Sequence, residues 1–161
     1  MQTQVMFYLL NDEAVNSHST DLSKNVDVSD TSSAFYHACV QASYFYRQNQ
    51  RVFIYTKDQN QAEQVDELLW SFDSDSFVPH NLVGEGPKQG AAVEISYQAP
   101  RGRRPVLINL TDTVPSFASQ FRFIVDFIPS DETLKQQARE RFKACRQWGF
   151  QVDHQAIEKT P

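Results

Sequence analysis

The chain has 161 residues, 40% of them hydrophobic, and a formal net charge of −5 at pH 7. This length suits one domain with a core of its own. A net negative charge argues against broad binding to nucleic-acid backbones, which requires clustered lysine and arginine, although a local basic patch is compatible with it. The N-terminus has no charged leader followed by a long apolar run, and no window reaches the length of a transmembrane helix. We therefore expect a cytoplasmic protein without membrane contact.

Four segments of the chain have the composition of buried strands. Residues 4–10 form a short, nearly all-apolar run, which is typical of a strand covered on both faces. Residues 51–56 are a second predicted buried strand, and residues 92–97 and 105–110 are two further predicted strands. The sequence therefore predicts at least four strands, distributed over the first two thirds of the chain.

Helical patterns separate these strands. Apolar residues recur at helical spacing in 33–50, and again after Asp58, whose side chain we expect to cap the second helix. The apolar segment 117–128 predicts a helix, or a helix that passes into a strand. Ser130 opens the last predicted helix, and Gly149 ends it. Alternating strands and helices imply crossover connections, so we predict a single-domain α/β protein over 1–161, a three-layer Rossmann-like fold with a mainly parallel sheet.

Two polar segments and two cysteines complete the chain. Residues 11–33 show no periodicity and are long for a loop in a compact domain, so we expect them to be a mobile loop. Residues 151–161 are expected to form a polar C-terminal tail. Cys39 and Cys145 lie far apart inside helical patterns, without metal-ligand spacing, and we expect both to be buried thiols.

No arrangement of residues indicates catalysis, a metal or a cofactor. The first strand lacks a glycine-rich turn after it, and the glycines within 84–90 precede a strand, so no helix N-terminus would face a phosphate. His80 has no nucleophile motif or second histidine near it, and we interpret it as a hydrogen-bonded structural residue. We favour a binding protein over an enzyme. A nucleotide-binding enzyme stays open as an alternative, because Rossmann-like sheets host many activities.

A second alternative is a protein that binds single-stranded DNA directly. Tyr97 is followed closely by three arginines, and aromatic rings combined with basic side chains can stack on bases and track a strand. Three arginines in one turn of an acidic protein also serve simply to keep a loop solvated. The arginines concerned are Arg101, Arg103 and Arg104.

Two long segments of the chain resemble the chi subunit of bacterial DNA polymerase III: DSFVPHNLVGEGP at 75–87 and VDFIPSDETLKQQARERFKACRQWGF at 125–150. FYLL at 7–10 and DELLW at 66–70 agree with the same family. The resemblance implies an accessory subunit in DNA replication, without catalysis or cofactor of its own, within a DNA-directed DNA polymerase (nucleotidyltransferase) complex. It also implies two protein partners. One is the psi subunit, which tethers chi to the clamp loader, and the other is the acidic C-terminal tail of single-stranded-DNA-binding protein, so that DNA is contacted only indirectly.

The last predicted helix suits an acidic tail that ends in Asp and Phe residues. On a helical wheel its cations form a stripe beside the apolar stripe, a pattern shared by many helices that simply cover a core. We hypothesise that two phenylalanines line a pocket for the terminal ring, while Arg139 and Lys143 hold carboxylates and Lys135 and Arg146 form an electrostatic rim. The complete candidate site is Lys135, Arg139, Phe142, Lys143, Arg146 and Phe150.

The family resemblance assigns the region after the second helix to psi. Large aromatic residues gather there, and such residues are enriched at stable interfaces. We predict that the psi interface contains Trp70, Phe77, Val78, Pro79 and His80, with His80 as a hydrogen-bonding residue at its rim. The same surface is open to a different partner, such as an accessory helicase.

Overall fold

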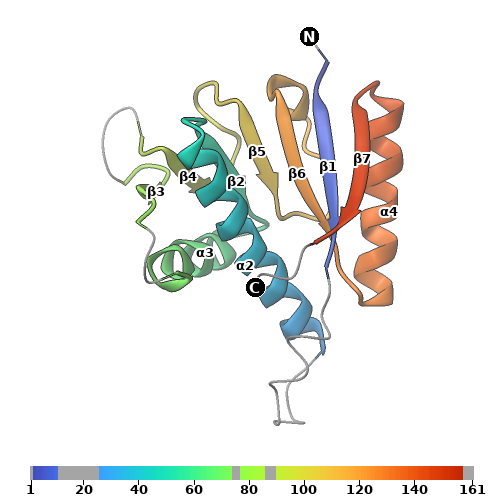
Figure 1. The fold of residues 1–161 in the computed structure, drawn as a ribbon, viewed down its shortest axis with the longest axis horizontal. Helices are drawn as coiled ribbons and strands as arrows, with labels where there is room; N and C mark the ends of the chain where they lie inside the picture. The colour runs from blue at the N-terminus through green and yellow to red at the C-terminus, as the bar shows by residue number, and fades with distance from the viewer. Residues whose placement is uncertain (1, 11–25, 74–76, 86–89, 158–161) are drawn as a thin grey trace.

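One parallel sheet forms the centre of the molecule. The computed structural model describes residues 2–10, 26–73, 77–85 and 90–157. Within these ranges a seven-stranded sheet runs in the order β3-β4-β2-β5-β6-β1-β7, and each neighbouring pair is parallel. The predicted α/β fold is therefore confirmed (Figure 1). The strands are β1 (Gln4–Leu9), β2 (Val52–Tyr55), β3 (His80–Leu82), β4 (Val93–Ser96), β5 (Val106–Asn109), β6 (Phe123–Ile128) and β7 (Gln151–Ala156).

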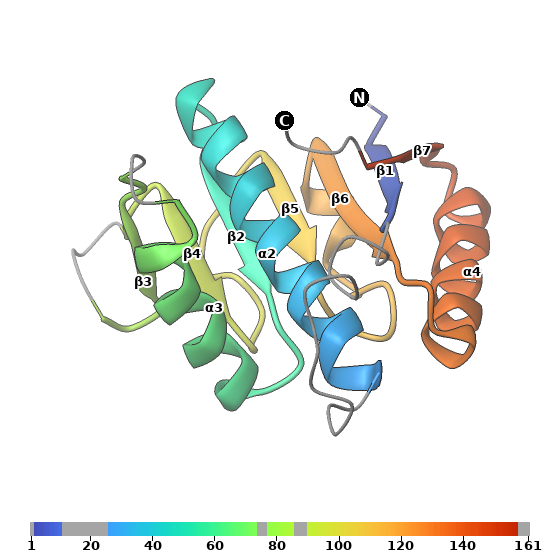
Figure 2. The same ribbon diagram turned by 60° about the horizontal axis from the view of Figure 1, so that its bottom comes forward.

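Helices cover both faces of this sheet. α2 and α3 pack over one face of the sheet (Figure 2). α4 packs on the other face together with the short 3-10 helix η1. Because successive side chains of a strand point to opposite faces, β2 sends Val52 and Ile54 into the first core and Phe53 into the second. The predicted three-layer arrangement follows from these two cores. The helices are α2 (Val26–Arg47), α3 (Gln59–Ser71), η1 (Ala118–Gln120) and α4 (Glu132–Gln147).

Side-chain caps fix where α3 and α4 begin. Asp58 caps α3 as predicted, because its carboxylate accepts a 2.8 Å hydrogen bond from the backbone N–H of Gln61. In α4 the cap is Asp131, which accepts a 3.0 Å hydrogen bond from the N–H of Leu134. The last helix therefore begins one residue later than the predicted start at Ser130.

A glycine turn ends α4 and directs the chain into β7. Gly149 takes a φ of 84°, a left-handed conformation that glycine adopts without strain. The N–H of Gly149 donates to the carbonyl of Arg146 at 3.0 Å, and the N–H of Phe150 donates to the carbonyl of Cys145 at 3.1 Å. This pattern is a Schellman motif, in which the residue after the glycine packs back on the helix. The motif fixes the place of Phe150, which packs in the same apolar cluster as Cys145.

Several predicted boundaries were wrong. The last part of the expected mobile loop, from Val26 on, belongs to α2, and residues 11–25 lie outside the described residues. The expected polar tail begins with a strand, since Gln151–Ala156 pairs along the whole of β1. For segment 117–128 the second of the two predicted alternatives is confirmed, because the short helix η1 passes into the strand β6. The short strand β3 was not predicted.

The two cysteines are buried, as predicted. Cys39 lies in the core between α2 and the sheet, and Cys145 lies in the core beneath α4. Burial raises the pKa of each thiol to about 12. Among the helices of the described ranges, none is both long enough and apolar enough to cross a membrane.

Candidate binding surfaces

The four cations predicted on the last helix form an exposed row along α4. We call Lys135, Arg139, Lys143 and Arg146 the basic stripe. Lys135 is half-buried, and its ammonium lies 3.8 Å from the carboxylate of Glu132. The other three side chains are exposed, and none of them forms an ion pair with any residue that the structure describes. α4 therefore presents three uncompensated positive charges on one side.

Aromatic rings border this stripe where α4 meets β7. Phe142 is half-buried, with its ring centroid 5.2 Å from that of Phe7 and 6.0 Å from that of His154 on β7. Phe150 is also half-buried and lies 5.7 Å from Trp148, measured between ring centroids. Trp148 is 46% exposed and was missed by the sequence analysis, although a tryptophan just before a helix-ending glycine is a usable signal. Partly exposed rings thus lie between the cations of α4 and the core, whereas no described contact joins Phe142 directly to Phe150.

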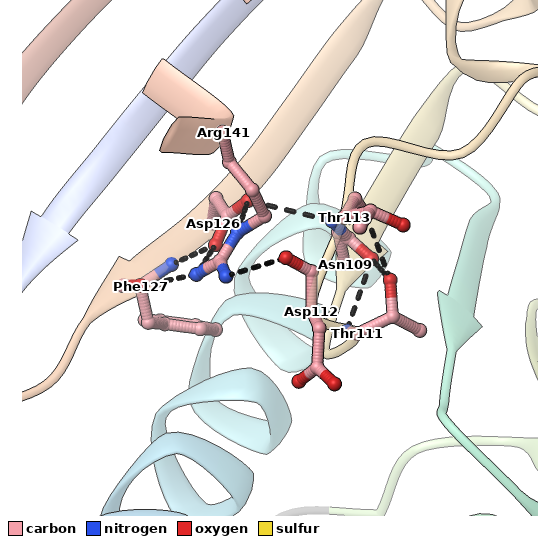
Figure 3. Close-up of polar contacts among 7 residues, drawn as sticks. All are labelled: Asn109, Thr111, Asp112, Thr113, Asp126, Phe127 and Arg141. Atoms are coloured by element: carbon pink, nitrogen blue, oxygen red, sulfur yellow. Dashed lines mark hydrogen bonds and ion pairs between the residues drawn. The ribbon is translucent and has the colours of Figure 1, made fainter. Parts of the chain in front are cut away.

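A buried ion pair fastens the opposite side of α4 to the sheet. Arg141 points inward, and its Nε and Nη2 donate to the two carboxylate oxygens of Asp126 on β6 at 2.9 and 3.0 Å (Figure 3). The same guanidinium donates to the carbonyls of Asp112 at 3.2 Å and Phe127 at 3.1 Å. Asn109 donates to the Asp126 carboxylate at 3.4 Å. The carboxylate and the guanidinium are therefore extensively hydrogen-bonded although both residues are buried.

This pair sets the rotation of α4 about its own axis. Burial raises the pKa of the Asp126 carboxyl, and the guanidinium of Arg141 acts against that shift by favouring the carboxylate. Because Arg141 is held inward by two fixed hydrogen bonds, residues on the other side of the helix must face solvent. Arg139 lies on that outer side. The sequence analysis missed Arg141, although an arginine on the apolar side of a helix wheel predicts a buried acidic partner.

A second exposed feature lies at the far edge of the sheet. Trp70 at the end of α3 is 63% exposed and Phe77 is 68% exposed, with ring centroids 6.2 Å apart. Trp70 also stacks edge-on against the ring of His80 on β3, at 4.6 Å. We call Trp70 and Phe77 the aromatic patch. Two large rings exposed side by side are unusual on a surface that stays in water.

The other residues predicted for this interface have a different place. Val78 is only 2% exposed and belongs to the core beneath α3, so it is not available to a partner in this fold. The ring of His80 is also buried, with 1% of the side chain exposed. Its Nδ1 lies 2.7 Å from the Val78 carbonyl, and its Nε2 lies 3.1 Å from the Asp66 carbonyl. His80 is thus a structural residue that supports Trp70 from below and not a residue of the rim, while Pro79 is half-buried.

The structure weakens both alternative interpretations. Arg104, one of the arginines considered for DNA binding, is buried and paired with Glu94, and it donates to the carbonyl of Ala92 at 3.0 Å. Tyr97 follows the carboxyl end of β4, whereas Arg104 lies at the amino end of the same strand, so Arg104 does not join Tyr97 in one cluster. The glycines considered for phosphate binding belong to the connection between β3 and β4, and no helix follows them; residues 86–89 lie outside the described residues.

Comparison with known proteins gives a family. The model of the family described as "DNA polymerase III chi subunit, HolC" matches residues 1–153. The chain belongs to the DNA polymerase III chi subunit family. Among its relatives, the DNA polymerase III subunit chi of Escherichia coli (strain K12) is 46% identical over 117 residues, which cover 71% of this chain and 80% of that protein. The same subunit of Haemophilus influenzae is 40% identical over 122 residues, covering 74% of this chain and 85% of the relative.

A solved structure extends the comparison to the fold. The structure described as "The crystal structure of T4 UvsW" aligns with a TM-score of 0.62 at 10% identity and covers 97% of this chain. The alignment covers only 41% of the UvsW chain. At this identity the likeness concerns the α/β fold of the chi-family chain alone.

Proposed function

We propose that this chi-family chain is a non-catalytic accessory subunit of DNA polymerase III that links two other proteins. It binds the psi subunit, and through psi the clamp loader, with the aromatic patch. It binds the acidic C-terminal tail of single-stranded-DNA-binding protein with α4. The observation that carries the tail proposal is the row of three exposed cations that have no acidic partner in the described chain and are bordered by half-buried rings.

The tail chemistry matches the outer side of α4. Guanidinium and ammonium groups pair with carboxylates through charge-assisted hydrogen bonds, and Arg139 and Lys143 are one helical turn apart. The terminal phenylalanine would pack against Phe142 and Phe150, which leave part of their apolar surface uncovered. Arg146 would act at the rim, where charge affects the association rate and salt dependence more than affinity. Lys135 contributes less than a free cation would, because Glu132 already lies close to it.

The psi proposal rests on the aromatic patch. Trp70 and Phe77 have the exposure and the mutual contact of interface anchors. Val78, Pro79 and His80 shape the platform beneath them, since Val78 and the His80 ring are buried. Binding would therefore depend on two rings supported by a rigid base.

The two surfaces lie far enough apart for both partners to bind together. The aromatic patch lies beside β3 and the basic stripe lies beside β7, and these are the two edges of the sheet (Figures 1 and 2). Six strand spacings of ~4.8 Å separate the edges, which is roughly 29 Å. A bridging role requires such a separation.

Fluorescence anisotropy with a labelled acidic peptide ending in Phe tests the tail site. Arg139→Ala should weaken binding by a factor of about 5 to 30, the range for losing one charge-assisted contact of about 1–2 kcal/mol. Arg47→Ala is the matched control, because Arg47 is an exposed arginine at the end of α2, away from α4. Equal binding by the parent and Arg139→Ala at physiological salt would remove this assignment.

Co-purification with psi tests the aromatic patch. Phe77→Glu places a charge among apolar contacts and should abolish recovery of psi while leaving peptide binding unchanged. Tyr44→Glu is the control, since Tyr44 is 50% exposed on α2 and outside the patch. Full recovery of psi by Phe77→Glu would refute the role of the patch.

A further inference from the structure

An open groove lies at the amino ends of the strands and belongs to neither proposed surface. It has a volume of about 420 Å³ and is bounded by the start of β1, the start of β5 and the segment from η1 into β6. We call it the amino-edge groove. The polar residues that line it and enter the argument are Gln2, Thr3, Arg103, Arg104, Gln120 and Arg122.

The charge of this groove is positive and uncompensated. Arg103 and Arg122 are exposed, and within the described residues neither forms an ion pair. Arg104 has a structural role instead, because it is buried and forms an ion pair with Glu94. From 95 to 125 the chain has four arginines and a single acidic residue, Asp112, whose carboxylate pairs with Lys57 at 3.0 Å. This ion pair follows β2 and β5 at the carboxyl edge of the sheet, so Asp112 does not neutralise Arg103 or Arg122 at the amino edge.

The groove adjoins the C-terminal end of α4, where the basic stripe ends at Arg146. Gln2 donates from its side-chain amide to the carbonyl of Gly149, at 2.8 Å, so the start of β1 touches the turn that ends α4. The backbone N–H of Gln4 donates to the carbonyl of Arg122, at 2.9 Å, so the same short segment touches the groove on its other side. Figure 1 shows the C-terminal end of α4 and the start of β6 at the same edge of the sheet.

The distance between the amino-edge groove and the C-terminal end of α4 is short. β6 and β7 are separated only by β1, and two strand spacings amount to ~10 Å. An extended peptide advances ~3.3 Å per residue, so three or four residues cross this distance. A peptide whose end lies beside Phe150 can therefore reach Arg122 without leaving the surface.

We propose that the amino-edge groove is a second subsite for the acidic tail, and that Arg122 and Arg103 hold acidic residues upstream of its terminal phenylalanine. The inference rests on the proposed function of α4. Guanidinium groups present a planar fork of donors that matches a carboxylate, and Gln2 and Gln120 add neutral donors beside them. An acidic peptide suits the groove better than single-stranded DNA does. Base stacking requires an open ring, and the ring that lines the groove, Phe121, is only 3% exposed.

Two peptides separate this subsite from the site on α4. The short peptide ends in two aspartates and a phenylalanine, and the long peptide has the same end preceded by about four more aspartates, enough to cross ~10 Å. The parent should bind the long peptide more tightly than the short one, by a factor of about 3 to 10, because exposed charge pairs contribute modestly. The double variant Arg103→Ala/Arg122→Ala should lose this advantage and bind the short peptide as the parent does. Arg139→Ala should weaken both peptides, and Arg47→Ala should weaken neither.

Each alternative result has a separate meaning. Equal affinity of the parent for both peptides, or an unchanged advantage in the double variant, overturns the subsite and leaves the α4 proposal standing. If Arg139→Ala weakens neither peptide, the α4 proposal fails and the subsite, as an extension of it, fails too. A labelled oligothymidine at low salt tests the other ligand. If it binds in a way that depends on Arg103 and Arg122, and peptide length has no effect, the groove is assigned to nucleic acid and the peptide subsite is overturned. Thermal melts of the variants confirm that the exposed substitutions leave the fold intact.

Discussion

Removing the guanidinium of Arg141 should destabilise the protein far more than removing a nearby arginine on the same helix. Arg141→Met keeps most of the side-chain length but leaves the Asp126 carboxylate, itself 2% exposed, without its partner. Two charge-assisted hydrogen bonds to the carboxylate, at 2.9 and 3.0 Å, are lost together with two bonds to backbone carbonyls. Breaking a buried ion pair from one side costs roughly 3–5 kcal/mol.

Chemical denaturation followed by circular dichroism measures this cost. A domain of this size loses ~2–4 °C of melting temperature per kcal/mol, so the same variant should melt roughly 6–20 °C lower. Arg139→Met is the matched control, because the same substitution at an exposed position should change the free energy of unfolding by less than about 0.5 kcal/mol. The double variant Asp126→Leu/Arg141→Met removes both charges and should recover part of the loss.

The pH dependence separates a buried charge from a simple packing defect. Without Arg141, burial of Asp126 is opposed only by the hydrogen bonds from Asn109 and from the backbone N–H of Phe127, so the pKa of this carboxyl in the folded variant rises further above its value in the unfolded chain. A folded-state pKa that is raised makes the free energy of unfolding fall as pH rises through it. The deficit of Arg141→Met relative to the parent should therefore be larger at pH 7 than at pH 5. A deficit below about 1 kcal/mol, or one independent of pH, would refute the claim that this pair fastens α4.

Two further predictions concern local geometry. Gly90→Ala should destabilise the protein by about 1–2 kcal/mol more than Gly84→Ala, as measured by chemical denaturation, because both glycines have positive φ but only at Gly90 would the new methyl group strike a buried ion pair. Equal losses in the free energy of unfolding for the two variants would show that the chain around Gly90 relaxes freely. Cys39 and Cys145, with each pKa raised to about 12, should not react with a thiol reagent at pH 8 until the protein unfolds. Because those pKa values lie above that of an unfolded thiol, the free energy of unfolding should fall above about pH 9, by up to ~1.4 kcal/mol per pH unit for each thiol. Rapid labelling of the native protein would contradict this.

The parts of the fold that could be predicted are those whose burial determines their composition. β1, β2 and β5 contain continuous apolar runs and β4 contains two buried apolar residues, and these compositions predicted them. β7 has no such run, because it is an exposed edge strand held by backbone pairing with β1. Backbone pairing leaves no pattern in the sequence.

The same reasoning explains the other errors of the sequence analysis. For β6 and η1, which share one apolar segment, the sequence left two alternatives open, because a strand buried on both faces cannot be distinguished from a buried helix by periodicity alone. The first turns of α2, which begins at Val26, are mainly polar in sequence, so no apolar periodicity predicted them.

Among the candidate sites, the basic stripe could be predicted because helical spacing alone brings its members together. The sequence analysis placed Trp70 and Phe77 at an interface, but it could not separate them from Val78, which is core and has a similar apolar character. A pattern of residue types does not state which of several adjacent apolar side chains turns outward. The amino-edge groove was beyond sequence reasoning as well, since Arg103 and Arg122 meet only when β5 and β6 pair.

The central claim is that one chain holds psi and the acidic tail at the same time. The direct test immobilises a peptide with the acidic, phenylalanine-ending tail, adds the chain together with psi, and measures the psi retained at two salt concentrations. We expect psi to be retained only when the chain is present, to be lost when the terminal phenylalanine is removed from the peptide, and to decline as salt rises. Retention of the chain without psi, or release of the chain from the peptide when psi is added, would contradict the bridge between opposite edges of the sheet.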